Sequence, residues 1–161
     1  DEANIDDWAN HLSTIFTEVR VKQYLEIRPA DSCSWSGICS IPAFWTGILY
    51  NQNILDECFD IFKDWTFKEV NEAYAQSAKK GFEAELYNKK MIDHAKFFLN
   101  LSKRGLENRD ILNSNNDNES IFLKDLDNFI INKKNLSNKL IDDFNKKYIN
   151  NIDLIFDEKA F

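Results

Sequence analysis

The residues best suited to chemistry lie on a stretch of regular alternation between positions 18 and 28, which reads E-V-R-V-K-Q-Y-L-E-I-R. Every second residue of this stretch is charged or phenolic: Glu18, Arg20, Lys22, Tyr24, Glu26 and Arg28. Carboxylate oxygens are ligands that Mg²⁺ prefers, and guanidinium or ammonium groups bind phosphate oxygens. A row that carries both kinds of group is suited to phosphoryl transfer assisted by a divalent metal ion.

The same row has a second, purely structural interpretation. A solvated sheet face ordinarily carries charges of both signs, and ion pairs there contribute only about a few tenths of a kcal/mol each. Two features favour the catalytic interpretation. Tyr24 lies in the middle of the row, and Glu26 and Arg28 lie at its C-terminal end, next to the segment Pro29–Ser32 and a predicted helix. Ligand-binding residues commonly lie in loops at such ends.

The element that positions this row is predicted to be a strand. The alternate positions of this stretch are apolar, interrupted only by Gln23: Val19, Val21, Leu25 and Ile27. We expect this apolar row to lie against a core. A strand from residue 18 to residue 28 is about 35 Å long at about 3.3 Å per residue. No second convincing strand is found in the sequence, and a lone strand is unstable in water. We therefore expect its partner strands to come from a second molecule or, as we favour, from polypeptide outside this chain.

Most of the remaining chain is predicted to be helical because its apolar residues recur at helical spacing. The predicted helices cover residues 5–16, 42–50, 52–65, 66–80, 89–106, 119–132 and 136–150. Pro42 is expected in the first turn of a buried helix, Thr66 begins a capping-box sequence, and Gly81 marks the end of the helix that Thr66 opens. The Asn-rich run 113–118 predicts an exposed loop.

Composition and charge exclude several classes of function. The chain has 161 residues, 43% of them hydrophobic and 14% aromatic, which indicates one domain with a core rather than a disordered tail. A net charge of −7 disfavours nucleic-acid binding. No apolar run approaches the roughly 20 residues that span a bilayer, and no signal peptide is recognised.

The three cysteines Cys33, Cys39 and Cys58 form no paired spacing. They indicate a reducing compartment, and we expect a cytoplasmic location. The first residue is Asp1 rather than Met, so we expect a trimmed chain or one that begins inside a longer gene product. His11, His94 and Cys39 are expected to be structural residues rather than catalytic ones.

Three runs resemble a known family. They are DWANHLSTIFTEVRVKQYLEIRPAD at 7–31, CSIPAFWTGILYN at 39–51 and IDHAKFFLNLSKRGLENR at 92–109. These runs are similar to the C-terminal portion of glutamate–cysteine ligase from the plant and alphaproteobacterial branch. Thr17, Pro29 and Ser34 stand where the family typically has Pro, Gly and Pro, and Pro29 lacks a backbone N–H that relatives have.

The resemblance implies an α+β fold of the glutamine synthetase-like class, in which a curved antiparallel sheet surrounds the metal ions. This chain would supply one long sheet strand and a mostly helical C-terminal region of a single catalytic domain. Within residues 1–161 we expect a helix and the active-site strand over 1–35, a helical buttress over 36–112 and an Asn/Lys-rich helical tail over 113–161.

The resemblance also implies residue roles. Glu26 would be a Mg²⁺ ligand, and Arg28 would be the catalytic clamp on the transferred phosphoryl group or on the glutamate carboxylate. Arg20, Lys22 and Tyr24 would line the ATP or substrate end of the site. The expected reaction joins glutamate to cysteine and uses ATP and Mg²⁺. An active enzyme would also need the missing N-terminal part of the same protein. The alternatives are a related carboxylate–amine ligase with another acceptor and a non-catalytic helical interaction module.

Overall fold

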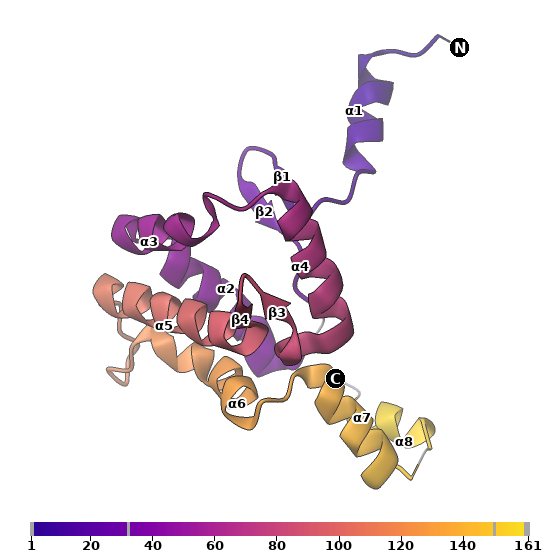
Figure 1. Ribbon diagram of the computed structural model, residues 1–161, viewed down its shortest axis with the longest axis vertical. Coiled ribbons are helices and arrows are strands. Elements are labelled where there is room, and N and C mark those ends of the chain that lie inside the picture. Colours follow the sequence, from indigo (N-terminus) through magenta and orange to yellow (C-terminus); the bar gives the residue numbers. More distant parts are fainter. Residues whose placement is uncertain (1, 32, 150, 160–161) are drawn as a thin grey trace. The chain divides into compact units, whose positions relative to one another are not determined.

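The computed structural model of the chain describes residues 2–31, 33–149 and 151–159 (Figure 1). The chain divides into two compact units, Asp1–Cys33 and Ser34–Phe161, which we call the N-terminal unit and the helical unit. Most described residues are helical, and the strands form two small antiparallel hairpins, which fits the α+β class. No helix in the described ranges is both long enough and apolar enough to cross a membrane.

The N-terminal unit begins with helix α1, Ile5–Ser13, which ends before the predicted Phe16. Asn4 and Asp7 form a capping box: the Asp7 N–H donates to Asn4 Oδ1 at 3.2 Å, and the Asn4 N–H donates to Asp7 Oδ2 at 2.9 Å. Such a cap satisfies N–H groups that have no partner inside the helix. No residue of α1 is buried, so its apolar side chains face outward.

The stretch predicted as one long strand is a hairpin instead. Strand β1, Val19–Val21, pairs antiparallel with β2, Leu25–Ile27. The turn between them is closed by the Lys22 N–H, which donates to the Tyr24 carbonyl at 2.8 Å. The prediction of an unbroken strand was therefore wrong. The chain supplies its own partner strand by folding back at Gln23, the residue that interrupts the apolar alternation. Backbone N–H and C=O groups that would have no partner in a single extended strand are thereby hydrogen-bonded to each other.

The burial of the hairpin is also the reverse of the prediction. The apolar side chains of Val21 and Leu25 are 77% and 63% exposed. The side chains of Arg20, Glu26 and Arg28 are only 22–33% exposed. Arg20, Glu26 and Arg28 therefore form the more protected face of this hairpin, and the expected burial of the apolar row against a core is not found within the described residues.

The helical unit is built around two helices that lie side by side, α2 (Trp35–Leu49) and α5 (Met91–Arg109) (Figure 1). They approach closely at two glycines. A Cβ atom on Gly105 would lie 1.7 Å from the Gly47 carbonyl oxygen, and a Cβ atom on Gly47 would lie 2.2 Å from the Ser102 carbonyl oxygen. Only glycine fits at such a contact. Gly105 lies inside α5, because the helix continues to Arg109 and not only to its predicted end at residue 106.

Pro42 lies in the interior of α2 and not in its first turn, because the helix begins seven residues earlier than Pro42, at Trp35. Ser34 caps this helix through its side-chain oxygen. A proline at an interior position has no N–H to donate to the carbonyl of residue 38, one turn earlier. The prediction failed because the N-cap signal of Ser34 was not recognised.

Two shorter helices precede α5. Helix α3 covers Gln52–Phe62, and α4 covers Phe67–Lys80. The predicted capping box at Thr66 is confirmed: the Thr66 N–H donates to Glu69 Oε2 at 2.8 Å. Gly81 ends α4 with φ of 53°, as predicted for this glycine. A 3₁₀ turn (η1, Gly81–Glu83) and a second hairpin, β3 (Glu85–Leu86) with β4 (Lys89–Lys90), then lead into α5.

The main hydrophobic cluster joins α2, α5 and the segment that follows the Asn-rich loop. Ala43, Leu99, Leu106 and Leu123 are buried there. Leu123 belongs to the 3₁₀ helix η2 (Glu119–Leu123), which is followed by α6 (Lys124–Asn132). The one helix predicted over 119–132 is thus divided in two. The loop before it is exposed, as predicted, and is closed by an isolated bridge between residues 112 and 118.

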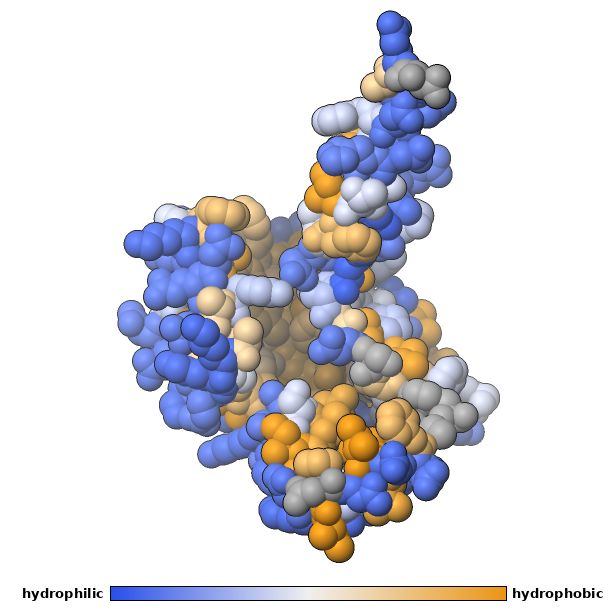
Figure 2. All heavy atoms as spheres, turned by 90° about the vertical axis from the view of Figure 1, so that its right-hand side faces the viewer, coloured by the Kyte–Doolittle hydropathy of each residue, from blue (hydrophilic) through white to orange (hydrophobic). Residues whose placement is uncertain are grey.

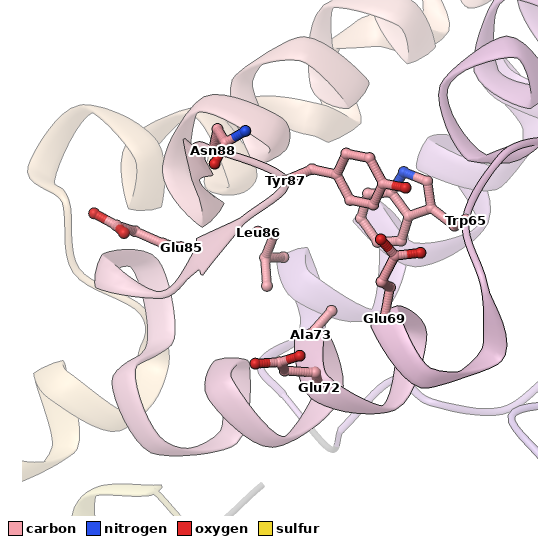
Figure 3. Close-up of a pocket in the computed structure, with 8 residues that line it drawn as sticks. All are labelled: Trp65, Glu69, Glu72, Ala73, Glu85, Leu86, Tyr87 and Asn88. Atoms are coloured by element: carbon pink, nitrogen blue, oxygen red, sulfur yellow. The ribbon is translucent and has the colours of Figure 1, made fainter.

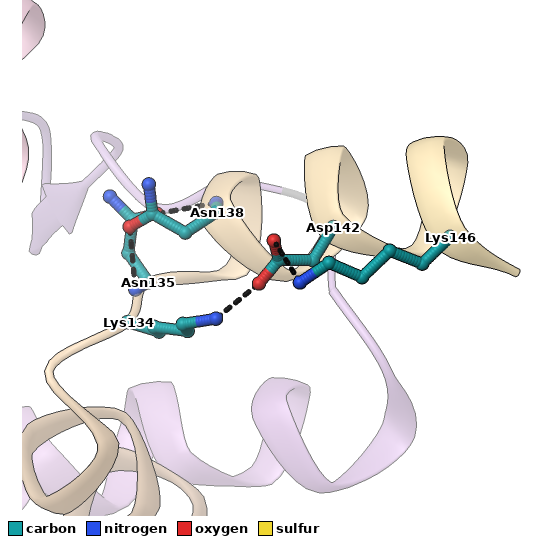
Figure 4. A network of polar contacts seen from close by, with 5 residues as sticks. All are labelled: Lys134, Asn135, Asn138, Asp142 and Lys146. Atoms are coloured by element: carbon teal, nitrogen blue, oxygen red, sulfur yellow. Dashed lines mark hydrogen bonds and ion pairs between the residues drawn. The ribbon is translucent and has the colours of Figure 1, made fainter. Parts of the chain in front are cut away.

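The C-terminal helices are α7 (Leu136–Lys146) and α8 (Asp153–Lys159). Figure 4 shows the polar network of α7, in which Asn135 and Asn138 form a capping box and Asp142 pairs with Lys134 and Lys146. The predicted end of α7 at Asn150 lies outside the described residues, as do Asp1 and Ser32. Figure 2 shows hydrophobic side chains on the surface at the lower end of the view, over α7 and α8. In this part of the chain the side chains of Ile141, Ile149, Ile152 and Phe156 are exposed.

Candidate functional site

The hairpin brings three of the predicted site residues together on one face. Arg20 Nε donates to Glu26 Oε2 at 2.7 Å, directly across the two strands. Arg28 Nη1 lies 3.9 Å from the same oxygen. Glu18 faces Arg28 through the backbone, because the Arg28 N–H donates to the Glu18 carbonyl at 2.9 Å. The period of two therefore correctly identified residues that share a face, although they come from two strands rather than one.

The two guanidinium groups keep Glu26 ionised. The hydrogen bond from Arg20 is the largest cause that lowers the pKa of the Glu26 carboxyl, and the charges of Arg20, Lys22 and Arg28 lower this pKa further. Desolvation acts in the opposite direction and does not outweigh them. The face therefore holds one carboxylate between two cations, with a local excess of positive charge.

Arg28 has hydrogen-bonding capacity that the described residues do not use. Its Nη1 atom is buried and has no hydrogen-bond partner among the residues that the structure describes. The guanidinium carbon lies 4.7 Å from the centroid of the Phe16 ring, a cation–π arrangement that orients the group. A buried donor without a partner calls for an explanation, and an anionic ligand that receives its N–H group would supply one.

Lys22 and Tyr24 do not join this cluster. Both lie in the turn between β1 and β2, and the Tyr24 side chain is 62% exposed. The structure gives neither of them a contact to Glu26 or Arg28, although the charge of Lys22 contributes to the lowered pKa of Glu26. Their predicted contact with ATP or substrate stays a prediction.

The described residues by themselves do not form a complete metal site. Over residues 2–31, 33–149 and 151–159, no three His, Cys, Asp or Glu side chains are placed to hold a metal ion together. The ion pairs of Glu26 are closest at Oε2, and within the described residues neither guanidinium donates a hydrogen bond to Oε1. Glu26 therefore fits the role of one oxygen ligand within a larger set.

The other candidate residues have structural surroundings. His94 is buried, at 9% exposure, and its Nε2 lies 3.0 Å from the Leu86 carbonyl oxygen. His11 lies against the Trp8 ring, with 5.9 Å between the centroids. All three cysteines are free thiols, and burial raises the pKa of Cys58, which makes it a poor nucleophile.

Sequence reasoning missed an aromatic cluster in the helical unit. The rings of Trp65 and Tyr87 are stacked, with centroids 4.7 Å apart and planes inclined by 6°. The pair lines a cavity of about 380 Å³. Figure 3 shows the stacked pair, with Glu69 directed towards the Tyr87 hydroxyl. The cluster was missed because Tyr87 lies in the turn between β3 and β4. These strands have two residues each, which is too short for an alternating pattern to be detected, and the dipeptide Tyr87-Asn88 is the only local indication of the turn.

Comparison with known proteins identifies relatives over nearly the whole chain. The chain is 35% identical to the chloroplastic glutamate–cysteine ligase A of Oryza sativa subsp. indica over 157 residues, which is 98% of this chain and 31% of that protein. It is 34% identical to the chloroplastic glutamate–cysteine ligases of Solanum lycopersicum and Arabidopsis thaliana, covering 98% and 97% of this chain and 29% of each relative. The chain thus spans about three tenths of the length of these curated relatives.

These names overturn the expected cytoplasmic location, because the matched plant enzymes are all named chloroplastic. The expectation was wrong for a physical reason. Sparse, unpaired cysteines report a reducing environment, and they carry no information about which reducing compartment holds the protein.

The match to a family model is equally extensive. The model of glutamate–cysteine ligase family 2 covers residues 1–142, which include the hairpin, the aromatic cluster and the core of the helical unit. The resemblance noted in the sequence is thereby confirmed over a longer stretch than the three runs that first indicated it. This chain belongs to glutamate–cysteine ligase family 2.

Proposed function

We propose that this chain is the C-terminal part of an ATP- and Mg²⁺-dependent glutamate–cysteine ligase. The complete protein would join the γ-carboxylate of glutamate to the amine of cysteine, the first step of glutathione synthesis. The observation that carries the proposal is the cluster of Arg20, Glu26 and Arg28 on the protected face of the hairpin, in a chain of this family.

The chemistry explains why such a cluster is useful. A carboxylate does not react with an amine at neutral pH, so a γ-carboxylate oxygen first attacks the γ-phosphorus of ATP and ADP leaves. The amine nitrogen of cysteine then attacks the acyl carbon of the γ-glutamyl phosphate, phosphate leaves, and the amine loses its proton. Both steps depend on positioning and on neutralising the phosphoryl oxygens.

In this proposal Arg28 is the catalytic clamp. Its guanidinium is oriented by Phe16 and offers an N–H group without a partner among the described residues. It would bind either the transferred phosphoryl group or the carboxylate of glutamate. A guanidinium can present two parallel N–H groups to two oxygens, which a lysine ammonium cannot do.

Glu26 would contribute one ligand to Mg²⁺, which when bound supplies positive charge next to the phosphoryl oxygens. Arg20 holds the Glu26 carboxylate in one orientation through the 2.7 Å hydrogen bond and keeps it ionised. Lys22 and Tyr24, exposed at the turn, are proposed to contact ATP or substrate. The remaining metal ligands would come from the part of the enzyme outside this chain, so we propose that the chain alone is inactive.

We further propose that the complete fold is of the glutamine synthetase-like class and that the hairpin joins its curved sheet. The exposed apolar face supports this proposal, because Val19, Val21 and Leu25 need a covering that the described residues do not provide. Strands of three residues with open edges are also too short to be stable as an isolated sheet.

The experiment that tests the activity is an assay of the full-length protein with ATP, Mg²⁺, glutamate and a series of acceptor amines. We expect ADP release that depends on both glutamate and cysteine, with γ-glutamylcysteine as the product. ADP release with another amine and not with cysteine would show a related ligase with a different acceptor. The absence of Mg²⁺-ATP binding would show a non-catalytic interaction module, and either outcome would overturn the proposal.

A further inference from the structure

The helical unit contains a second cavity, of about 620 Å³, which the proposed ligase chemistry does not use. Its lining includes Trp65, Tyr87, Lys89, Asp93, His94 and Phe97, and all its residues come from the stretch 61–97. This volume is within the range of about 300–1,000 Å³ that is typical of small-molecule sites.

One wall of the cavity is aromatic. Trp65 and Tyr87 form the stacked pair already described, and the ring of His94 meets Trp65 edge-on, with centroids 6.3 Å apart and an interplanar angle of 83°. Phe97 adds a further ring to the lining. Such a wall suits an apolar or aromatic group of a ligand, which gains both burial and ring contacts there.

The position of Tyr87 in this wall is fixed by an unfavourable backbone conformation. Tyr87 and Asn88 have φ of 50° and 59°, the left-handed values of a two-residue hairpin turn that favours Asn and Gly. A tyrosine rarely adopts this conformation. Here the stacking on Trp65 holds the ring in place, and the Glu69 carboxylate is directed towards the Tyr87 hydroxyl (Figure 3).

A buried polar group in the lining has an unused acceptor. His94 is nine-tenths buried, and its Nε2 lies 3.0 Å from the Leu86 carbonyl oxygen. A carbonyl oxygen only accepts hydrogen bonds, so Nε2 donates to it, and Nδ1 is the ring nitrogen that stays open to a ligand. In the described parts of the chain Nδ1 has no hydrogen-bond partner. A ligand N–H group would satisfy it.

Two opposite charges complete the lining. Lys89 makes no ion pair with the described residues, and Asp93 has only a 3.9 Å contact to Lys96 at an exposed position. An ammonium and a carboxylate beside an aromatic wall are complementary to a ligand that carries a carboxylate, an ammonium and an apolar group.

We propose that this cavity binds a free α-amino acid with an aromatic side chain. Lys89 forms an ion pair with the carboxylate of the amino acid. Asp93 and His94 Nδ1 accept hydrogen bonds from its ammonium group. Its ring packs against Trp65, Tyr87 and Phe97.

The test is calorimetric titration of the full-length protein with L-phenylalanine in the absence of ATP, glutamate and cysteine, so that its outcome is independent of the proposed ligase activity. For a ligand of this size we expect a Kd of about 1 mM or lower. Phenethylamine, which lacks the carboxylate, and 3-phenylpropionate, which lacks the ammonium, should each bind at least about tenfold more weakly.

Variants assign the two charges. Lys89→Met should weaken L-phenylalanine and 3-phenylpropionate about tenfold and leave phenethylamine unchanged, whereas Asp93→Asn should weaken L-phenylalanine and phenethylamine and leave 3-phenylpropionate unchanged. Lys139→Met, at an exposed position on α7, is the matched control and should change none of them. No binding of L-phenylalanine to the unaltered protein at about 10 mM would overturn the proposal. The same holds if both variants bind all three compounds as the unaltered protein does.

Discussion

Arg20 and Glu26 lie directly opposite each other on β1 and β2, and their side chains are joined by a 2.7 Å hydrogen bond. This pair holds the Glu26 carboxylate next to Arg28, on the less exposed face of the hairpin. The arrangement makes Glu26 a fixed carboxylate rather than a mobile surface group. It also makes the pKa of Glu26 a direct measure of whether the hairpin exists.

The first prediction concerns that pKa. Because the hydrogen bond from Arg20 is the largest cause of the lowered pKa of Glu26, Arg20→Gln should raise this pKa towards its ordinary value. A carboxyl with a lowered pKa in the folded state contributes stability at neutral pH, and this contribution is lost as the pH falls through the folded-state pKa. The variant should therefore show a smaller loss of stability on acidification. Both effects are measured by an NMR titration of the Glu26 side chain and by denaturant unfolding across acidic pH.

An unchanged pKa in Arg20→Gln would contradict the cross-strand pair. Arg104→Gln is the control, because Arg104 pairs with Glu57 on the helical unit and should leave the Glu26 titration as it is.

The second prediction concerns the crossing of α2 and α5. Gly105→Ala places a methyl group 1.7 Å from the Gly47 carbonyl oxygen, so the two helices must move apart. We expect the free energy of unfolding to fall by about 3 kcal/mol, at the upper end of typical overpacking costs. Asn100→Ala, at an exposed position of the same helix, should change it by no more than about 0.5 kcal/mol. Chemical denaturation of the two variants measures both values, and equal stabilities would show that the helices do not cross at these glycines.

The third prediction concerns the start of α4. The Thr66 hydroxyl accepts a hydrogen bond from the Glu69 N–H at 3.3 Å, so Thr66→Ala removes the cap of this helix. A loss of about 1 kcal/mol is typical of such a change, and Thr66→Ser should retain most of the stability because it keeps the hydroxyl. The melting temperatures of the two variants give the comparison. A serine variant as unstable as the alanine variant would assign the effect to the lost methyl group instead.

Features that depend on residues close together in the sequence were predicted better than features that depend on contacts between distant segments. The capping box of Thr66 and the helix end at Gly81 were correct because both are local backbone effects. The alternation of charged and apolar residues correctly predicted that Glu26 and Arg28 lie on one face, and the pairing of β1 with β2 keeps them there. The turn itself was missed because Lys22-Gln23-Tyr24 contains none of the Gly, Pro, Asn or Asp residues that ordinarily indicate one.

The features that the sequence did not reveal arise from contacts between distant segments. Pro42 was misplaced for two reasons: the N-cap of Ser34 was not recognised, and the pairing of α2 with α5 supports a helix that continues through a proline. The stacking of Arg28 on Phe16 and of Trp65 on Tyr87 joins residues more than ten positions apart, and no periodicity encodes such contacts. The division of the catalytic domain over residues 1–161 and the roles of the site residues stay predictions.

The central claim is that the protected charged face of the hairpin acts on the reacting phosphoryl group, and the most direct test is kcat of the full-length enzyme carrying Arg28→Lys or Glu26→Gln. Arg28→Lys keeps the charge and removes the planar pair of donors, and Glu26→Gln removes the proposed Mg²⁺ ligand, so each should lower kcat at least about 100-fold. Glu107→Gln, at an exposed position on α5, is the control and should retain full turnover. If the Glu26→Gln enzyme keeps the wild-type kcat and Mg²⁺ dependence, the metal role of Glu26 is wrong. If the Arg28→Lys enzyme also keeps the wild-type kcat, the charged face has no part in the reaction.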